Sequence, residues 1–280
     1  MNKIFLRSTV ITLIICAICL WYFKDQYHRY LWNDEAIPDA ANFVLSGDIP
    51  ELKWELIGEY PHAREAFTQG LTYSNGFLYE GTGNYGYSKI SVGKLENGAI
   101  YHQQKLDPSY FGEGITLKGD SLLFLTWKEG KALIFQKDSL AKIAEFDYDG
   151  EGWGLAWSEK QDAFLMTNGS AELQKRNAAD FSIVEKVTVR DGLGKLSKLN
   201  ELELVGDTLW ANVWGSDYAL AVDPESGKIL ASVNLRALKY QMKGRAFANV
   251  LNGIAYKPET DTFLITGKNW TRIFEVKILR

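Results

Sequence analysis

Five short stretches of the chain place a polar or aromatic side chain two residues before an apolar strand. The residues at this position are Gln69, Glu113, Trp153, Asn200 and Asn252, which recur at intervals of roughly 40 to 52 residues. A carboxylate that converges with amide side chains and an indole is suited to proton transfer on a small polar ligand. This chemistry requires a fold that brings all five stretches together.

Each stretch opens a unit with the same internal plan. A turn and a second apolar strand follow every start, at residues 76–79, 121–124, 163–166, 208–211 and 262–265. A strand-rich repeat of about 40–50 residues is typical of a propeller blade. Coincidence among glycine- and aromatic-rich strands is the alternative, but five units match in order and in internal length. We therefore predict an all-β, five-bladed β-propeller.

The two ends of the predicted domain complement each other. Residues 53–60 form a plausible strand without a unit of its own, and residues 272–279 alternate polar and apolar side chains. Pairing of these segments would complete the fifth blade and remove exposed sheet edges. Residues 235–248 are basic and lack strand alternation, so we expect a short helix inserted before the last blade.

A propeller would bring the five positions to one mouth, because the innermost strand of each blade lines the central axis. The second strand runs back toward the same mouth, which adds Trp127, Trp214 and Lys268. One pocket would then hold a carboxylate, a lysine, three amides and several aromatic rings, as suits a small polar ligand with an apolar backing. The alternative is that these side chains only fill the channel.

Composition excludes several functions. The 280 residues carry a net charge of −4 without a basic stripe, so we expect no nucleic-acid partner. The only cysteines, Cys16 and Cys19, lie in the N-terminal apolar run, which leaves the domain without a disulfide or a thiol nucleophile. The three histidines lack metal-site spacing. We therefore predict neither a metal nor another cofactor.

The N-terminus carries a separate signal. Lys3 and Arg7 precede an almost wholly apolar run at residues 10–23, which is typical of a signal peptide or a short membrane anchor. No clean cleavage site follows, so we favour an uncleaved anchor. The expected organisation is a signal or membrane-anchor helix at 1–24, a linker at 25–50 and the propeller at 51–280. The domain would be a monomer exported to the periplasmic side of the cell envelope, either membrane-anchored or secreted.

Eight motifs from about residue 60 to the C-terminus carry a family resemblance. They are Tyr60-Pro61-His62, Phe67-Thr68-Gln69-Gly70-Leu71, Tyr110-Phe111-Gly112-Glu113-Gly114, Gly152-Trp153-Gly154-Leu155-Ala156, Leu199-Asn200-Glu201-Leu202-Glu203, Ala211-Asn212-Val213-Trp214, Val250-Leu251-Asn252-Gly253-Ile254-Ala255 and Thr266-Gly267-Lys268-Asn269-Trp270. In this order they resemble the plant-type and bacterial glutaminyl cyclases, which are glutaminyl-peptide cyclotransferases. The resemblance implies a five-bladed propeller unrelated to the zinc-dependent animal enzymes.

The resemblance also implies a reaction and its substrates, which are peptides or proteins with an N-terminal glutamine. The free α-amine attacks the γ-carboxamide carbon of the same residue, giving pyroglutamate and ammonia. No protein nucleophile is needed. The reaction requires a substrate folded for attack, a proton shuttle and stabilisation of the tetrahedral oxygen.

By position in these motifs, the resemblance assigns Glu113 as the proton shuttle. We expect Lys268 to stabilise the oxyanion or to set the charge state of Glu113. The amides of Gln69, Asn200 and Asn252 would hold the γ-amide and the peptide backbone. Five aromatic side chains would wall the pocket and exclude water: Phe67, Phe111, Trp127, Trp153 and Trp214.

Two other functions fit parts of the pattern. A non-catalytic propeller that binds peptides in the cell envelope would keep the aromatic side chains but would not need Glu113 and Lys268 together. A cation-dependent propeller hydrolase, such as a lactonase, needs several carboxylates at the mouth. Among the five equivalent inner positions, only Glu113 carries a carboxylate.

Overall fold

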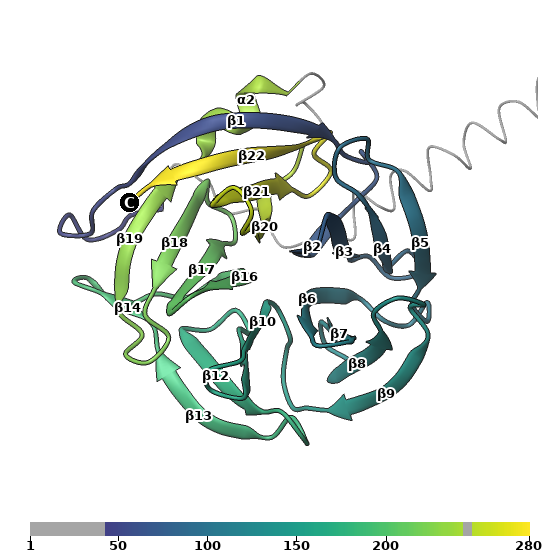
Figure 1. The fold of residues 1–280 in the computed structure, drawn as a ribbon. Coiled ribbons are helices and arrows are strands. Elements are labelled where there is room, and N and C mark those ends of the chain that lie inside the picture. The colour runs from purple at the N-terminus through teal and green to yellow at the C-terminus, as the bar shows by residue number, and fades with distance from the viewer. Residues whose placement is uncertain (1–42, 243–247) are drawn as a thin grey trace, which may run out of the picture. The chain divides into compact units, whose positions relative to one another are not determined.

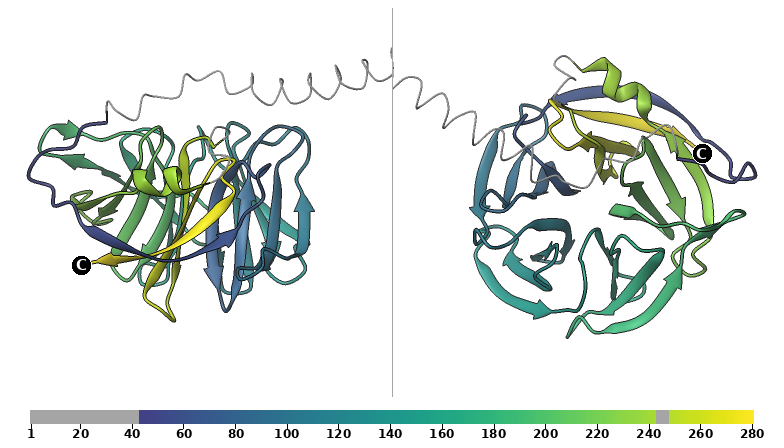
Figure 2. Two further views of the ribbon diagram at one scale, coloured as in Figure 1. Left: turned by 90° about the horizontal axis from the view of Figure 1, so that it is seen from above. Right: turned by 180° about the vertical axis from the view of Figure 1, so that it is seen from behind.

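The strands are arranged as sheets around one axis (Figure 1). The computed structural model describes residues 43–242 and 248–280. Within these residues, five four-stranded antiparallel sheets surround the axis. The predicted five-bladed, all-β propeller is therefore confirmed. In the view perpendicular to the axis, the blades stand side by side and their strands run roughly along it (Figure 2).

Four blades are formed from consecutive strands, ordered from the axis outward. The first has β2 (Thr68–Ser74), β3 (Phe77–Thr82), β4 (Lys89–Lys94) and β5 (Ile100–Lys105). The second has β6 (Gly112–Lys118), β7 (Ser121–Thr126), β8 (Lys131–Gln136) and β9 (Lys142–Asp147). The third has β10 (Leu155–Ser158), β11 (Ala163–Met166), β12 (Glu172–Asn177) and β13 (Ile183–Thr188). The fourth has β16 (Leu199–Val205), β17 (Thr208–Val213), β18 (Tyr218–Val222) and β19 (Ile229–Asn234).

The fifth blade is formed from both ends of the described chain. Its strands are β20 (Leu251–Lys257), β21 (Thr262–Gly267), β22 (Arg272–Leu279) and, on the outside, β1 (Lys53–Pro61). The register of β1 and β22 runs from Lys53 opposite Leu279 to Pro61 opposite Arg272. This is the closure predicted from the two end segments. It leaves the last blade with the same number of strands as the others, and so closes the ring.

Two smaller features lie between the blades. The hairpin of β14 (Arg190–Asp191) and β15 (Gly194–Lys195) connects the third blade to the fourth. Helix α2 (Arg236–Gln241) precedes the last blade, where the sequence predicts a short helix, and Leu238 is its buried residue. Residues 243–247 of the predicted helical segment lie outside the described residues.

The predicted anchor or signal segment, residues 1–24, lies outside the described residues, as do residues 25–42 of the predicted linker. The rest of that linker packs on the fourth blade: Phe43, Leu45 and Ile49 contact its hydrophobic core. In the part of the chain that the structure describes, no helix combines the length and the apolar composition that crossing a membrane requires.

The core consists of apolar side chains packed between neighbouring blades. Leu71 of β2, for example, packs with Ala255 and Leu264 of the fifth blade, while Ile115 of β6 packs with Tyr79 and Ile90 of the first. The outermost strands β5 and β9 are largely exposed. Because each blade is stabilised by its neighbours, the positions of the inner strands are fixed by the closed ring.

The inner strands meet so closely that particular glycines are required. A Cβ atom added to Gly154 would lie 1.8 Å from the backbone oxygen of Asn200 in the next blade. A Cβ on Gly70 would lie 2.4 Å from the nitrogen of Ile115, and one on Gly114 would lie 2.5 Å from the oxygen of Trp153. These glycines follow the predicted site residues directly, so close approach of the backbones and placement of the site are coupled.

We expect Gly154→Ala to destabilise the domain by about 1–3 kcal/mol, because the new methyl group forces two backbones apart. Gly47→Ala is the matched control, since no atom lies within 4 Å of the added Cβ there. Denaturant unfolding of both variants measures the difference. Equal stabilities would contradict the proposed close packing at the axis.

Candidate active site

The inner strands are irregular where the predicted site residues lie. The pairing of the first two strands shifts register between Thr68 and Gly70, between Gly112 and Ile115, between Leu199 and Leu202, and between Leu251 and Ile254. These four shifts flank Gln69, Glu113, Asn200 and Asn252. A bulge re-aims a side chain that regular pairing would leave in the sheet. Each of these four residues therefore lies at an irregularity of its strand, where its side chain can turn out of the sheet.

Three of the polar side chains form a chain of hydrogen bonds across the first, second and fifth blades. Asn252 Nδ2 donates to Gln69 Oε1 at 3.1 Å and to the backbone oxygen of Thr68 at 3.0 Å. Gln69 Nε2 then donates to Glu113 Oε1 at 2.9 Å. All three side chains are buried. The donor at one end of the Gln69 amide and the carboxylate at the other fix its orientation.

The ends of the second strands return to the same mouth, as predicted. The backbone nitrogen of Trp127 donates to the oxygen of Phe111 at 2.8 Å, and that of Lys268 donates to the oxygen of Val250 at 3.0 Å. Lys268 Nζ lies 4.7 Å from the centroid of the Phe67 ring, a cation–π contact. The lysine is 5 % exposed, so its charge is held at the buried mouth.

The five predicted aromatic residues form two contacting groups. The Phe111 ring lies 6.2 Å from that of Phe67 and 5.4 Å from that of Trp127, whereas Trp153 and Trp214 are 6.1 Å apart. A carboxylate that was not among the predicted site residues joins the two groups. Glu151 Oε2 accepts the indole N–H of Trp127 at 2.8 Å and that of Trp153 at 3.0 Å.

Glu151 precedes the Gly152-Trp153-Gly154 motif by one position, and this proximity is the one signal for it in the sequence. Its second partner, Trp127, is 24 residues away. Since one carboxylate oxygen accepts both indoles, Glu151 fixes the relative orientation of two walls of the predicted pocket.

Two predicted amides retain unused hydrogen-bonding capacity. Among the described residues, neither Asn200 Oδ1 nor Asn252 Oδ1 has a hydrogen-bond partner, although both atoms are buried. A buried acceptor without a donor costs about 1–3 kcal/mol. In a concave polar site, such acceptors are suited to a ligand that brings N–H groups.

A second glutamate lies at the axis, and it was not among the site residues predicted from the sequence. Four of the five repeats have glycine directly after the predicted position, but the fourth has Glu201. Its Oε1 accepts the backbone N–H of Leu71 at 3.1 Å and its Oε2 accepts that of Ile254 at 2.8 Å. Glu201 thus ties the fourth blade to the first and the fifth. Burial raises the pKa of Glu201 well above its usual value.

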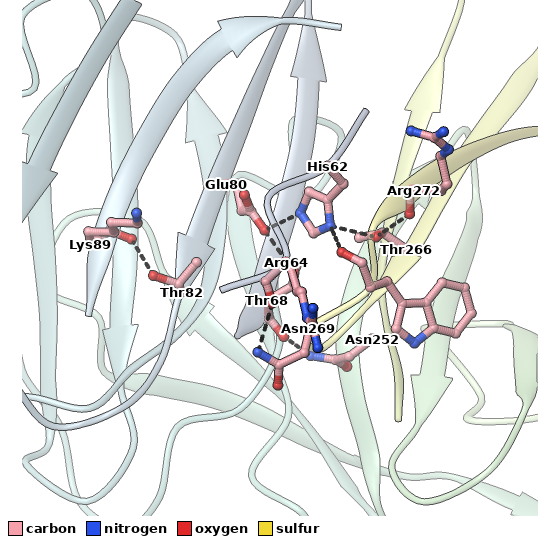
Figure 3. A network of polar contacts seen from close by, with 11 residues as sticks. His62, Arg64, Thr68, Glu80, Thr82, Lys89, Asn252, Thr266, Asn269 and Arg272 are labelled. Carbon is pink, nitrogen blue, oxygen red and sulfur yellow. Dashed lines mark hydrogen bonds and ion pairs between the residues drawn. The ribbon is translucent and has the colours of Figure 1, made fainter. Parts of the chain in front are cut away.

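A buried ion pair, His62 and Glu80, contacts the residue that precedes Gln69 in the first blade (Figure 3). His62 Nε2 lies 2.9 Å from Glu80 Oε1, and His62 Nδ1 lies 2.8 Å from the backbone oxygen of Trp270. Both ring nitrogens face acceptors, so both carry protons. Burial opposes this charge, but the Glu80 carboxylate outweighs it and raises the pKa of His62. Glu80 also accepts the hydroxyl of Thr68, the residue before Gln69.

The described residues contain no cluster of three or more His, Cys, Asp or Glu side chains that could hold a metal ion. The carboxylates near the mouth instead accept hydrogen bonds from protein groups: Glu113 from Gln69, Glu151 from two indoles and Glu201 from two backbone amides.

Fold and site together define a class: a five-bladed propeller whose mouth holds carboxylates, a lysine and several amides among aromatic rings. A model of the glutamine cyclotransferase family matches residues 34–278. The chain is 34% identical to the glutaminyl-peptide cyclotransferase of Arabidopsis thaliana over 251 residues, which cover 88% of this chain and 77% of that protein. The crystal structure of the Myxococcus xanthus glutaminyl cyclase matches with a TM-score of 0.75 and 30% identity, over 83% of this chain and 100% of that chain. The chain therefore belongs to the glutamine cyclotransferase family.

The predicted site residues fall into three groups in space. Gln69, Glu113 and Asn252 are joined directly by hydrogen bonds. Lys268 contacts the ring of Phe67, and the other predicted aromatic residues contact one another around the site. Asn200 lies in the fourth blade, and its backbone oxygen accepts the hydroxyl of Thr167 at 2.9 Å. Their individual catalytic roles stay predictions.

The buried position of Glu201 predicts a pH-dependent stability. Its pKa is higher in the folded protein than in the unfolded chain, so as the pH rises above the usual value of 4.5 the unfolded chain releases its proton first and the folded state loses stability. Glu201→Gln removes this titration but leaves an amide NH2 facing a backbone N–H. We expect the variant to be less stable by about 1–3 kcal/mol near pH 5, with a gap that narrows toward pH 8.

Denaturant unfolding at several pH values measures this gap. Glu259→Gln, at an exposed position, is the control and should differ from the parent by only a small amount. A gap that widens with pH for Glu201→Gln would show that the carboxyl group is already ionised in the folded state.

Proposed function

We propose that this protein is a glutaminyl-peptide cyclotransferase, which converts N-terminal glutaminyl residues of peptides or proteins to pyroglutamate and ammonia. The observation that supports this best is the buried Asn252–Gln69–Glu113 chain, which ends in a carboxylate at a mouth walled by aromatic side chains. Family membership points to the same reaction. The activity needs no covalent intermediate.

Binding would fold the substrate glutamine back on itself. The unused oxygens of Asn200 and Asn252 would accept N–H groups of the α-amine or of the γ-amide. The aromatic side chains would pack on the methylene groups and exclude water. Holding amine and carboxamide in contact replaces a search through many conformers by one near-attack geometry, which contributes much of the rate acceleration in such reactions.

Glu113 would move the proton. The neutral α-amine attacks the γ-carboxamide carbon, the new C–N bond closes the ring, and the carboxylate of Glu113 takes a proton from the attacking nitrogen. The same proton is then delivered to the amide nitrogen as its bond to carbon breaks, so ammonia leaves and the carbonyl group re-forms. Lys268, 4.7 Å from the Phe67 ring, would stabilise the negative charge on the tetrahedral oxygen or adjust the charge state of Glu113.

We also propose an exported, membrane-associated protein on the periplasmic side of the cell envelope. The support is the apolar run at residues 10–23 behind Lys3 and Arg7. Protease treatment of spheroplasts tests this placement: the propeller should be digested while the membrane itself stays intact, and protection of the propeller would place it in the cytoplasm.

Glu113→Gln should lower kcat by roughly 10²–10⁴-fold, the usual contribution of a general acid–base group. The fold should persist, because the carbonyl oxygen of the new amide can still accept the hydrogen bond from Gln69. Ammonia release from a Gln-initiated dipeptide by the purified full-length protein measures the effect, with circular dichroism as the control for folding.

Near-parental turnover of this variant would remove Glu113 from the mechanism. If the folded parent releases no ammonia from any of several Gln-initiated peptides, the protein is instead a peptide-binding propeller. Binding of the same peptides, followed by tryptophan fluorescence, would then identify that function.

A further inference from the structure

A hollow lies beside Trp214, one of the predicted pocket walls. It has a volume of about 490 Å³, within the range of small-ligand pockets. Its lining comes from Phe43, from the β14–β15 hairpin with Asp191 and Lys195, and from the segment that ends at Lys198. The eight family motifs do not include this hairpin, and the proposed reaction assigns no role to the hollow.

The hollow carries positive charge that the described protein does not neutralise. The ion pairs among residues 43–242 and 248–280 involve neither Lys195 nor Lys198. Asp191 is engaged elsewhere: its Oδ2 accepts the backbone N–H of Ser46 at 2.9 Å, and its Oδ1 accepts that of Leu193 at 2.8 Å. Both lysines are exposed to solvent.

The backbone of Lys198 is fixed on both sides. Its nitrogen donates to the oxygen of Gly169 at 2.9 Å, and its oxygen accepts the N–H of Trp214 at 2.7 Å. Its φ of 69° is in the left-handed region, which is uncommon for a lysine. The side chain consequently extends over the Trp214 ring, with Nζ 5.5 Å from the centroid. The ammonium group is thus held at the rim of the hollow.

Trp214 lines the hollow and also contacts Trp153 of the candidate active site. This ring lies 6.1 Å from Trp153, which Glu151 holds at the mouth. The steps from Trp153 to Trp214 and from Trp214 to Lys198 Nζ are thus 6.1 Å and 5.5 Å. An extended peptide advances about 3.3–3.6 Å per residue, so about three residues, or two residues and an extended acidic side chain, span such a path.

We propose that this hollow is a subsite for the substrate chain beyond its N-terminal glutamine, and that Lys198, assisted by Lys195, binds a carboxylate at about the third or fourth residue of that chain. The inference rests on the proposed function. It makes the enzyme selective for peptides with an acidic side chain, or a free C-terminus, at that distance. Trp214 would contact the glutamine on one side and the following residues on the other.

The test compares kcat/KM for two C-terminally amidated peptides, Gln-Ala-Glu-Ala and Gln-Ala-Gln-Ala, with the full-length protein. We expect the acidic peptide to be preferred by roughly 2- to 5-fold, the range of an exposed charge interaction. Lys198→Gln should reduce the ratio of the two values toward one, and Lys198→Glu should reverse the preference in favour of a peptide with lysine at the third position. The preference should also weaken as salt is added.

Lys277→Gln is the matched control, because it removes the same charge from an exposed position on β22 in the fifth blade. It should leave the ratio as in the parent. A peptide series with the glutamate at each position from the second to the fifth locates the preferred side-chain carboxylate. A comparison of Gln-Ala-Ala as free acid and as amide tests whether a C-terminal carboxylate is bound instead. Two results would contradict the subsite. One is a parent enzyme whose kcat/KM is the same for acidic and neutral peptides at every position. The other is an equal change of the kcat/KM ratio in the Lys198 and Lys277 variants.

Failure of the proposed function is distinguishable from failure of the subsite. If no peptide releases ammonia, binding of the same two peptides tests the subsite. Quenching of tryptophan fluorescence measures their binding constants. Tighter binding of the acidic peptide, lost in Lys198→Gln and kept in Lys277→Gln, supports the subsite without catalysis. Equal binding of both peptides by the parent overturns it.

Discussion

Glu201 joins three blades at the axis, and the geometry of the mouth depends on this contact. Its two oxygens accept backbone N–H groups from β2 and β20, the innermost strands of the first and last blades. These are the blades that the two chain ends bring together. A buried carboxyl group is costly unless it is hydrogen-bonded. Because both oxygens of Glu201 accept hydrogen bonds, the group stabilises the junction and determines the spacing of the strands that carry Gln69 and Asn252.

The polar relay of the site crosses the same junction. Asn252 donates to Thr68 and Gln69, and Gln69 donates to Glu113, so the fifth blade orients a side chain of the first, which orients one of the second. The His62–Glu80 pair holds Thr68 from behind and contacts the loop that follows Lys268. A catalytic group needs placement within a fraction of an ångström. The closed ring supplies it, because no inner strand can move without its neighbours.

Three glutamates near the mouth have different tasks because their surroundings differ. Glu201 accepts two backbone amides and is structural, Glu151 holds two indoles, and Glu113 accepts an amide side chain at the end of the relay. The residue type alone does not separate these roles. The lysines are distributed in the same way: Lys268 lies against Phe67 inside the mouth, and Lys198 lies against Trp214 at its rim.

The sequence by itself determined the number of blades and the closure by the two end segments, and it predicted the mouth residues from Gln69 to Lys268. These features follow from strand periodicity and from the rule that equivalent positions of repeated blades converge, so local pattern was sufficient. The tertiary structure alone decided the roles of Glu201, Glu151 and His62. Their partners are up to 208 residues distant in the sequence. Which groups each side chain contacts depends on where the strands bulge and how closely the backbones meet. The hollow beside Lys198 likewise exists only because a hairpin between two blades and the segment that begins at Phe43 pack against the fourth blade.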